Sequence, residues 1–365
     1  MKSVIRFGLL VMLAVGALTP AFGAQAQAPK PCFGLADADC QLLYGASAQD
    51  NMGKLTSFVV DLALTGKATG APSGDVDFNI SGNGPIALDQ TALAALKSST
   101  GATMMTGLAS ALKGITLQDM FKIAVNAPKT PTNLSGEIRL VGGQFYYMSQ
   151  EKTAGKWMVM DLNTAMQKNP SLGMLGAMGA SSSPSAGAMK DPKLQADGQA
   201  LIKYIKASTS DGPSLDGAAT KQFTFDVDLS GLVNGPEMKQ FMTDATAAAA
   251  ASGSSSSSSM GMAQMYMPML AKLVSNSQLQ LKYLVGSDDK LFHGLELVFA
   301  IKLDAATMNA LQAMSSSGSS SSTKTPMTSD INANFDLKFT LSKIGQPVKV
   351  DPVPDAQKVG TGTTS

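Results

Sequence analysis

The chain has 365 residues, and its 28 Lys and Arg residues almost balance its 27 Asp and Glu residues. Hydrophobic residues make up 44% of the sequence, which is enough for a buried core and argues against a wholly disordered chain. The balanced charge excludes bulk electrostatic attraction to nucleic acid, and a single histidine excludes histidine-clustered metal sites. We therefore expect a protein that is not an enzyme and that has no metal, no cofactor and no nucleic-acid partner.

The first 28 residues have the pattern of an export signal. Lys2 and Arg6 are basic, residues 7–18 form an apolar run, and the small residues at 24–28 offer Ala-x-Ala cleavage sites. The apolar run is shorter than the roughly 20 residues that a bilayer requires. We therefore expect residues 1–28 to be a signal peptide that is removed. The mature chain should have no transmembrane segment and should be extracytoplasmic: secreted, periplasmic or associated with the cell wall.

Cys32 and Cys40 follow the expected leader and are the two cysteines of the chain. In an exported protein, two cysteines eight residues apart are most simply interpreted as a short-loop disulfide. Lipidation of Cys32 is disfavoured because Pro29-Lys30-Pro31 stands where small apolar residues are needed. A redox-active pair is disfavoured because the spacing is not Cys-x-x-Cys.

Alternation of apolar and polar residues predicts a series of strands with one buried and one wet face. In chain order they are residues 57–65, 75–81, 138–140, 144–149, 156–161, 223–229, 279–283, 295–301 and 331–341. The connection at 70–74 and the pair Gly142-Gly143 are turns that join neighbouring strands as hairpins. So many half-buried strands predict a large antiparallel sheet with a covered inner face.

Apolar periodicity predicts the helices that cover this inner face. Their ranges are about 37–55, 88–113, 162–178, 193–208, 236–251, 260–275 and 304–314. The strands supply the aromatic residues, whereas the helices supply the methionines, of which the chain has 23. Because methionine is unbranched and adaptable, we expect a deformable apolar pocket between sheet and helices. A solid core in which methionine fills gaps is the alternative.

Three tracts rich in Ser, Ala and Gly, at about 179–188, 247–259 and 315–322, lack the apolar content to pack. The strands on both sides of each tract share the same one-faced pattern. We therefore interpret the tracts as loop insertions within a single domain of residues 29–354. Residues 355–365 are predicted to be a disordered tail.

Two stretches of the sequence are similar to a known family. The first is LVGGQFYY at 140–147, followed by GKW at 155–157, which is a hairpin and then a Trp-bearing strand. The second is FTLSKIGQPVKVDP at 339–352, a closing strand and tail. With the helix expected at 191–208, these stretches resemble the LppX/LprG family of cell-envelope lipoproteins and, more distantly, the LolA carrier fold.

The resemblance implies an α+β fold of the LolA type: a curved antiparallel half-barrel whose concave face is covered by helices. Between them it implies an apolar cavity that holds the acyl chains of a lipid or glycolipid. The residues expected to line this cavity are Met104, Met105, Leu108, Leu112, Phe121, Met174, Met178, Met265, Met269 and Leu273. The chain departs from the family because it lacks a lipobox and because it carries long Ser-rich insertions. The predicted function is that of an exported lipid-binding carrier.

Two other functions compete with the lipid carrier. The first is a non-enzymatic envelope scaffold with a solid core that binds a protein partner. The second is copper binding, because Met260, Met262, Met265, Met267 and Met269 form a run of thioethers, which are soft ligands for Cu(I). Against copper, these residues would spread around a helix, and no His or Cys lies nearby in the sequence.

The remaining polar residues are predicted to have structural roles. Asp288-Asp289 has too few ligands for a calcium loop and is expected to be a solvated turn. His293 is expected to be a surface residue in a turn next to Gly294. The alternating pairs Asp75 with Asp77 and Asp226 with Asp228 are explained as solvent-facing strand positions.

Overall fold

A computed structural model describes the protein over residues 31–46, 51, 53–70, 74–98, 114–128, 131–161, 192–251, 271–272, 276–307, 309, 329–350, 353 and 356–358. Several predictions from the sequence lie outside these residues. They are the signal peptide, the helix at 162–178, the tract at 179–188, residues 252–259 of the tract at 247–259, nearly all of the helix at 260–275, the tract at 315–322 and most of the tail.

Twelve strands form one open sheet. They are β1 (Ser57–Thr69), β2 (Val76–Leu88), β3 (Ile115–Asn126), β4 (Thr132–Val141), β5 (Gln144–Ser149), β6 (Met158–Asp161), β7 (Ile205–Asp211), β8 (Thr220–Val227), β9 (Gln278–Gly286), β10 (Phe292–Leu303), β11 (Ile331–Ser342) and β12 (Gln357–Lys358). The order across the sheet is β12-β6-β5-β4-β3-β2-β1-β11-β10-β9-β8-β7. All neighbours are antiparallel except β12, which runs parallel to β6.

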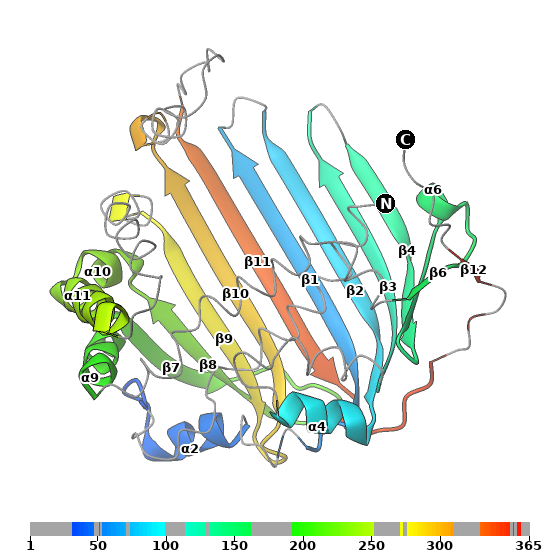
Figure 1. Cartoon of the computed structure of the whole chain (residues 1–365), viewed down its shortest axis with the longest axis horizontal. Helices are drawn as coiled ribbons and strands as arrows, with labels where there is room; N and C mark the ends of the chain where they lie inside the picture. The colour runs from blue at the N-terminus through cyan, green and yellow to red at the C-terminus, as the bar shows by residue number, and fades with distance from the viewer. Residues whose placement is uncertain are drawn as a thin grey trace.

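The described helices are short and lie around the sheet (Figure 1). They are α2 (Asp37–Ala46), α4 (Gln90–Ser98), α6 (Gln150–Thr153), α9 (Pro192–Ala200), the 3₁₀ helix η3 (Leu201–Tyr204), α10 (Leu229–Asn234) and α11 (Pro236–Ala251). In Figure 1, α9, α10 and α11 gather beyond β7 at one edge of the sheet, whereas α2 and α4 lie at its lower end. The predicted combination of an antiparallel sheet with helices is therefore confirmed.

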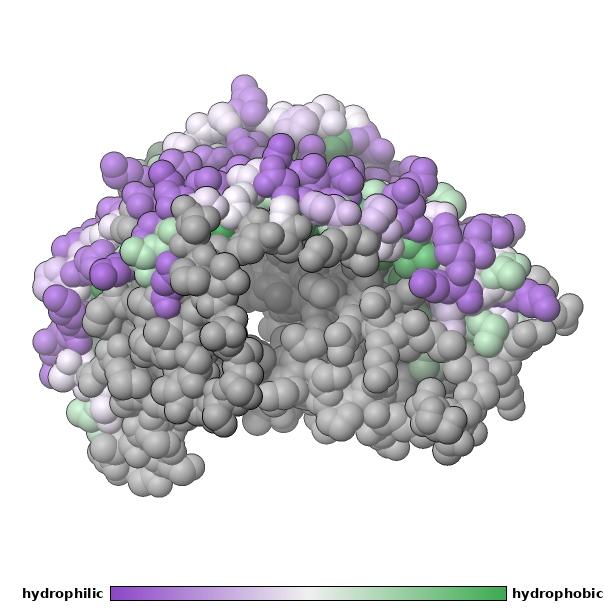
Figure 2. Space-filling view, turned by 90° about the horizontal axis from the view of Figure 1, so that it is seen from above, coloured by the Kyte–Doolittle hydropathy of each residue, from purple (hydrophilic) through white to green (hydrophobic). Residues whose placement is uncertain are grey.

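The sheet is curved, and its two faces differ in polarity. Figure 2, which looks along the sheet from above, shows the described residues as an arch with hydrophilic residues over the convex side. On β1, Asp61, Thr65 and Lys67 are exposed on this convex side, whereas Phe58, Val60 and Leu62 are buried on the other. The two-residue period read from the sequence therefore assigns the apolar residues to the concave face.

Buried residues of the concave face form two clusters. The larger lies on β1–β5 and β11 and consists of Phe58, Val60, Leu62, Ile86, Leu117, Phe121, Leu134, Ile138, Leu140, Phe145, Tyr147, Phe339 and Leu341. The smaller joins Ala46 of α2 to Phe223, Phe225 and Val285. Aromatic contacts link the clusters, because the Phe292 ring centroid lies 6.2 Å from that of Tyr283 and 6.4 Å from that of Phe339.

Several strands and turns agree with the pattern in the sequence. The predicted hairpin of β1 and β2 is formed, with Leu64 opposite Ile80. Gly142 and Gly143 turn between β4 and β5 with φ of +58° and +77°, values that favour glycine. Helix α11 covers the predicted range 236–251.

Other elements differ from the prediction. The helix expected at 193–208 ends early, because residues 205–211 form β7, where Ile205 and Ala207 pair with Val227 and Phe225 of β8. The alternation of Ile205, Ala207 and Thr209 suits a strand, and the neighbouring hairpin strand decides between the two structures. The helix expected at 37–55 ends at Ala46, and a turn at 53–54 precedes the start of β1 at Ser57.

The sequence prediction also missed strands β3 and β12 and misplaced a helix start. Strand β12 pairs with β6 within the tail at 355–365 that was expected to be disordered. Strand β3 was not predicted, because Asp119 interrupts the series of inward apolar residues. Strand β2 continues to Leu88, so the helix expected from residue 88 begins at Gln90, where Asp89 accepts a capping hydrogen bond from the Ala92 amide at 2.8 Å. Residues 99–113 of that expected helix lie outside the described chain.

Candidate functional site

The candidate site is the apolar concave face of the sheet. Pairing across strands aligns its side chains in rows: Leu341, Val60 and Gly84 follow one another in one row, and Phe339, Leu62 and Gly82 in the next. Side chains that share a face of paired strands contact each other directly. The strands therefore present a continuous apolar surface rather than isolated patches.

The concave face changes from buried to half-buried along the strands. At the lower end in Figure 1, near α2 and α4, its side chains are buried. At the upper end, where β1 connects to β2, the apolar residues are half-buried. They are Leu64, Phe78, Ile80, Ile123, Val125, Leu279, Leu281, Leu297, Phe299, Phe335 and Leu337. A band of partly exposed apolar side chains on one end of a curved sheet is suited to contact with an apolar ligand.

Glycines within the strands are covered by aromatic rings of neighbouring strands. Gly66 of β1 stands between Phe78 and Phe335, whose ring centroids are 5.9 Å apart. A Cβ atom at Gly66 would lie 2.3 Å from the Phe78 ring, so a larger residue would displace it. The glycine therefore leaves space for two large rings to approach each other at the half-buried end of the face.

Phe121, one of the predicted lining residues, lies on β3 in this concave face. Its neighbours across the sheet are Gly82 on β2 and Gly136 on β4, and its side chain is only 2% exposed. The structure thus places Phe121 in the larger buried cluster, while its contact with a ligand stays a prediction. The other predicted lining residues lie outside the described residues. They are Met104, Met105, Leu108, Leu112, Met174, Met178, Met265, Met269 and Leu273.

Asp119 is a carboxylate embedded in the same face, and the sequence pattern did not single it out. It is 7% exposed and lies between Leu117 and Phe121 on β3, opposite Ile138 of β4. Burial raises the pKa of its carboxyl to about 6, against the opposing effect of a hydrogen bond from the Asn83 backbone. Its Oδ1 atom is buried and has no hydrogen-bond partner among the described residues. An acidic residue within an apolar alternation was the signal that could have identified it.

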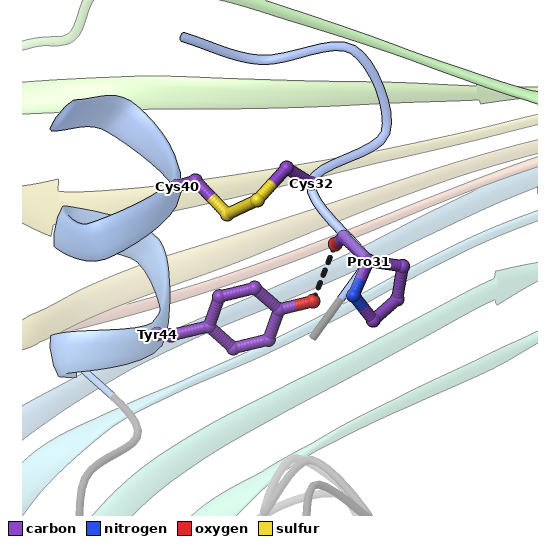
Figure 3. Close-up of a disulfide and its surroundings, with 4 residues drawn as sticks. All are labelled: Pro31, Cys32, Cys40 and Tyr44. Carbon is purple, nitrogen blue, oxygen red and sulfur yellow. Dashed lines mark hydrogen bonds between the residues drawn. A yellow bond between two sulfur atoms is a disulfide. The ribbon is translucent and has the colours of Figure 1, made fainter. Parts of the chain in front are cut away.

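A disulfide and a hydrogen bond hold helix α2 to the segment that precedes it (Figure 3). The predicted disulfide between Cys32 and Cys40 is present, with the two Cα atoms 5.4 Å apart, and the Tyr44 hydroxyl donates a hydrogen bond to the Pro31 carbonyl at 2.5 Å. Asp39 pairs with Lys221 of β8, and this hydrogen bond lowers the pKa of Asp39. The helix is therefore linked covalently to the preceding segment and electrostatically to the sheet.

The convex face carries a shallow groove of about 820 Å³. Residues of β1–β5 and β11 line it, with the charged side chains of Asp61, Lys122 and Lys338 around two methionines, Met120 and Met148. Met120 is 62% exposed, which is unusual for a large apolar side chain on a hydrophilic surface. The groove is polar at its margins and lies on the side opposite the apolar face.

His293 is not the surface residue that the sequence suggested. It is 4% exposed, because a bulge in β10 between Phe292 and Gly294 turns it inward. Its Nε2 atom lies 2.8 Å from Oδ2 of Asp289, which stands in the turn before β10. This pair links the turn that contains Asp289 to the start of β10.

Metal-binding clusters and membrane-spanning helices are both absent from the described part of the chain. Its residues contain no group of three or more His, Cys, Asp or Glu side chains that could hold a metal ion. None of its helices is long and apolar enough to cross a membrane. The methionine run at 260–269 considered for copper lies outside the described ranges.

No family model matches this chain, and no curated protein matches it. Among solved structures, it is similar to a beta-barrel-like protein of domain of unknown function DUF1849 from Brucella abortus. The match covers 79% of this chain and 99% of that one, at 9% sequence identity and a TM-score of 0.14.

Proposed function

We propose that the protein is an exported lipid-binding carrier that holds the acyl chains of a lipid or glycolipid against the concave face of its sheet. The observation that carries this proposal is the band of half-buried apolar side chains at the upper end of that face, which includes Leu64, Phe78 and Phe335. Because this band continues into the buried clusters, a chain that enters there stays in contact with apolar surface along the strands.

The composition of the face favours a ligand that is recognised by its apolar length. Each buried CH₂ group contributes about 0.8 kcal/mol, so an acyl chain gains affinity with length and with little dependence on its fine structure. The disulfide between Cys32 and Cys40 is typical of proteins that fold in an oxidising compartment, which supports export. Lipid transfer between layers of a cell envelope is the activity that fits such a protein.

Native mass spectrometry tests the proposal directly. The mature protein is purified without detergent and compared with the same sample after organic extraction. We expect a heterogeneous excess of mass that disappears on extraction and is identified in the extract as acyl lipid. A single apo mass, with no uptake from added lipid vesicles, would contradict the proposal and favour a solid scaffold.

A pair of adjacent substitutions on β2 separates the concave face from the convex one. Phe78→Glu introduces a charge at the half-buried apolar end, whereas Asn79→Glu introduces the same charge on the exposed convex face. We expect the first variant to take up at least about tenfold less lipid, because an unpaired charge beside an acyl chain is strongly disfavoured, and the second to bind as the wild type does. Melting curves of both variants, and of the milder Phe78→Ala, show whether the fold is retained.

The convex groove favours a second candidate function, that of a scaffold for a protein partner. Met120 is exposed there beside Lys122 and Glu137, and a flexible apolar side chain among charges is common at protein interfaces. A partner recovered from the native envelope that is lost on Met120→Glu, but retained on Phe78→Glu, would support this function.

A further inference from the structure

We propose that Asp119 is the polar anchor of the ligand site and that it selects lipids whose polar end carries a hydrogen-bond donor, an ammonium or hydroxyl group, over lipids that end in a carboxylate. This inference rests on the proposed lipid-binding function and adds to it the class of polar group and the direction in which the ligand lies.

Asp119 is surrounded by uncharged side chains. On the concave face of the described strands β1–β6, it is the one charged side chain, since the other positions are apolar residues, glycines, Tyr147, Ser149 and Thr132. Its Oδ1 atom is buried without a partner from these strands. A buried unpaired carboxylate oxygen costs free energy and is retained where function supplies the partner.

The backbone around Asp119 makes room for its carboxylate. Gly82 and Gly84 of β2 stand beside it, and a Cβ atom at Gly82 would lie 2.8 Å from Oδ2. A Cβ atom at Gly84 would lie 2.8 Å from the Asp119 Cα atom. Because Gly82 and Gly84 have no side chains, the Asp119 carboxylate occupies the space beside them on the concave face.

No cation in the described neighbouring strands compensates the carboxylate. The charged neighbours on β4, Glu137 and Arg139, alternate onto the convex face and pair with each other at 2.7 Å. Asp61 on the convex side of β1 disfavours the ionised form of Asp119 further. Tyr147, one strand beyond Ile138 in the same row, is the other titratable group of the concave face near it, and burial raises the pKa of its hydroxyl.

The position of Asp119 along β3 gives the orientation of the ligand. From Asp119 to Val125 the strand runs six residues toward the half-buried end, which is about 20 Å of apolar surface. This length matches a long acyl chain. The polar end is therefore anchored at Asp119, deep in the face, and the chain extends along Phe121, Ile123 and Val125 toward the exposed band.

Competition between three probes tests the inference. Delipidated wild-type protein is offered a long-chain primary amine, the alcohol and the fatty acid of equal chain length, and bound probe is quantified by native mass spectrometry at pH 7.5. A hydrogen bond to a charged group is strong enough that we expect roughly tenfold preference for the amine over the fatty acid. The alcohol should rank between them.

The Asp119→Asn variant should still bind chains but lose the preference for the amine, whereas Asp77→Asn, on the exposed convex face of β2, should keep it. Below pH 6 the protonated Asp119 donates a hydrogen bond, so the wild type should lose its preference, and the Asn variant should show no such pH dependence. This wild-type pH profile decides the matter even if the Asn variant does not fold.

The outcomes separate the two proposals. If the wild type binds all three probes equally, or if Asp119→Asn leaves the ranking unchanged, the anchor is wrong while lipid binding stands. If the wild type binds none of the probes, both proposals are overturned.

Discussion

At the scale of single residues, a few glycines and one aspartate interrupt the apolar side chains of the concave face and determine how they pack. Gly66 and Gly136 leave space that rings of Phe78 and Phe121 occupy, so the sheet keeps large side chains packed along its inner surface. Asp119 is the one charged residue on the concave face of the described strands β1–β6. Because its charged form is disfavoured in the folded protein, it links the stability of the protein to pH.

The pKa of Asp119 predicts how this dependence runs. Its value rises from the usual 3.8 to about 6 on folding, so the folded state binds more protons than the unfolded state between these pH values. Stability therefore falls as pH rises from about 4 to about 6 and stays lower above that, by roughly 3 kcal/mol. Asp119→Asn should be more stable than the wild type by about this amount at pH 7.5 and equally stable below pH 4.

Urea unfolding at a series of pH values measures this difference. Asp77→Asn, an exposed substitution on the neighbouring strand, is the control and should follow the wild-type curve. If Asp119→Asn is destabilising at pH 7.5, the carboxylate has a partner in solution and its burial is not the dominant effect.

At the scale of elements, the sheet depends on close approach of its strands at glycine positions. A Cβ atom at Gly136 of β4 would lie 2.1 Å from the carbonyl oxygen of Met148 in the adjacent β5. Backbone atoms of a paired strand cannot move aside as a side chain can. The β4–β5 pairing, which carries Ile138 and Tyr147 in the core, is therefore sensitive to any side chain at this position.

Two glycine-to-alanine substitutions should have opposite effects. Gly136→Ala should lower stability by about 1–3 kcal/mol because β4 and β5 must separate. Gly198→Ala, in helix α9, meets no atom within 4 Å and should raise it by about 0.5–1 kcal/mol because alanine favours the helix. Denaturant midpoints compare the two, and a neutral Gly136→Ala would show that the β4–β5 pairing is loose in solution.

At the scale of the whole molecule, the sheet joins chain segments that are far apart in the sequence. Strand β1 pairs with β11 from Val59 opposite Ser342 to Thr69 opposite Asn332, which unites the first and last parts of the chain. Ring contacts of Phe292 with Tyr283 and Phe339 connect the two buried clusters across this region. We therefore expect the sheet to unfold as one unit.

A substitution in one cluster, observed in the other, tests this expectation. Trp157 is the single tryptophan and lies on the β4–β6 side of the sheet, where the Arg139 Cζ atom is 4.7 Å from the centroid of its ring. Phe223→Leu removes packing in the smaller cluster at a cost of about 1 kcal/mol. The fluorescence midpoint of Trp157 should shift with the circular dichroism midpoint. An unchanged fluorescence midpoint would mean that the two sides unfold independently.

The sequence by itself determined the local features of this protein. The two-residue period placed most strands and assigned Phe58, Val60 and Leu62 to the inner face, because alternation is a property of neighbouring residues. The pairing of Cys32 with Cys40 followed from their short separation. Of the candidate site, the sequence named Phe121, which lies in the larger buried cluster, and its contact with a ligand stays a prediction.

Only the tertiary structure decided the features that depend on pairing between distant segments. The turn at 70–74 predicted the pairing of β1 with β2, but the pairing of β1 with β11 has no local signature, since any strand of the same pattern could take that place. Residues 205–211 form a strand because they pair with β8. His293 points inward because β10 has a bulge where it pairs with β9. In the sequence, Asp119 only interrupts an apolar alternation, whereas in the structure it is buried between β2 and β4. The burial of a charged side chain depends on the assembled sheet and not on the residue alone.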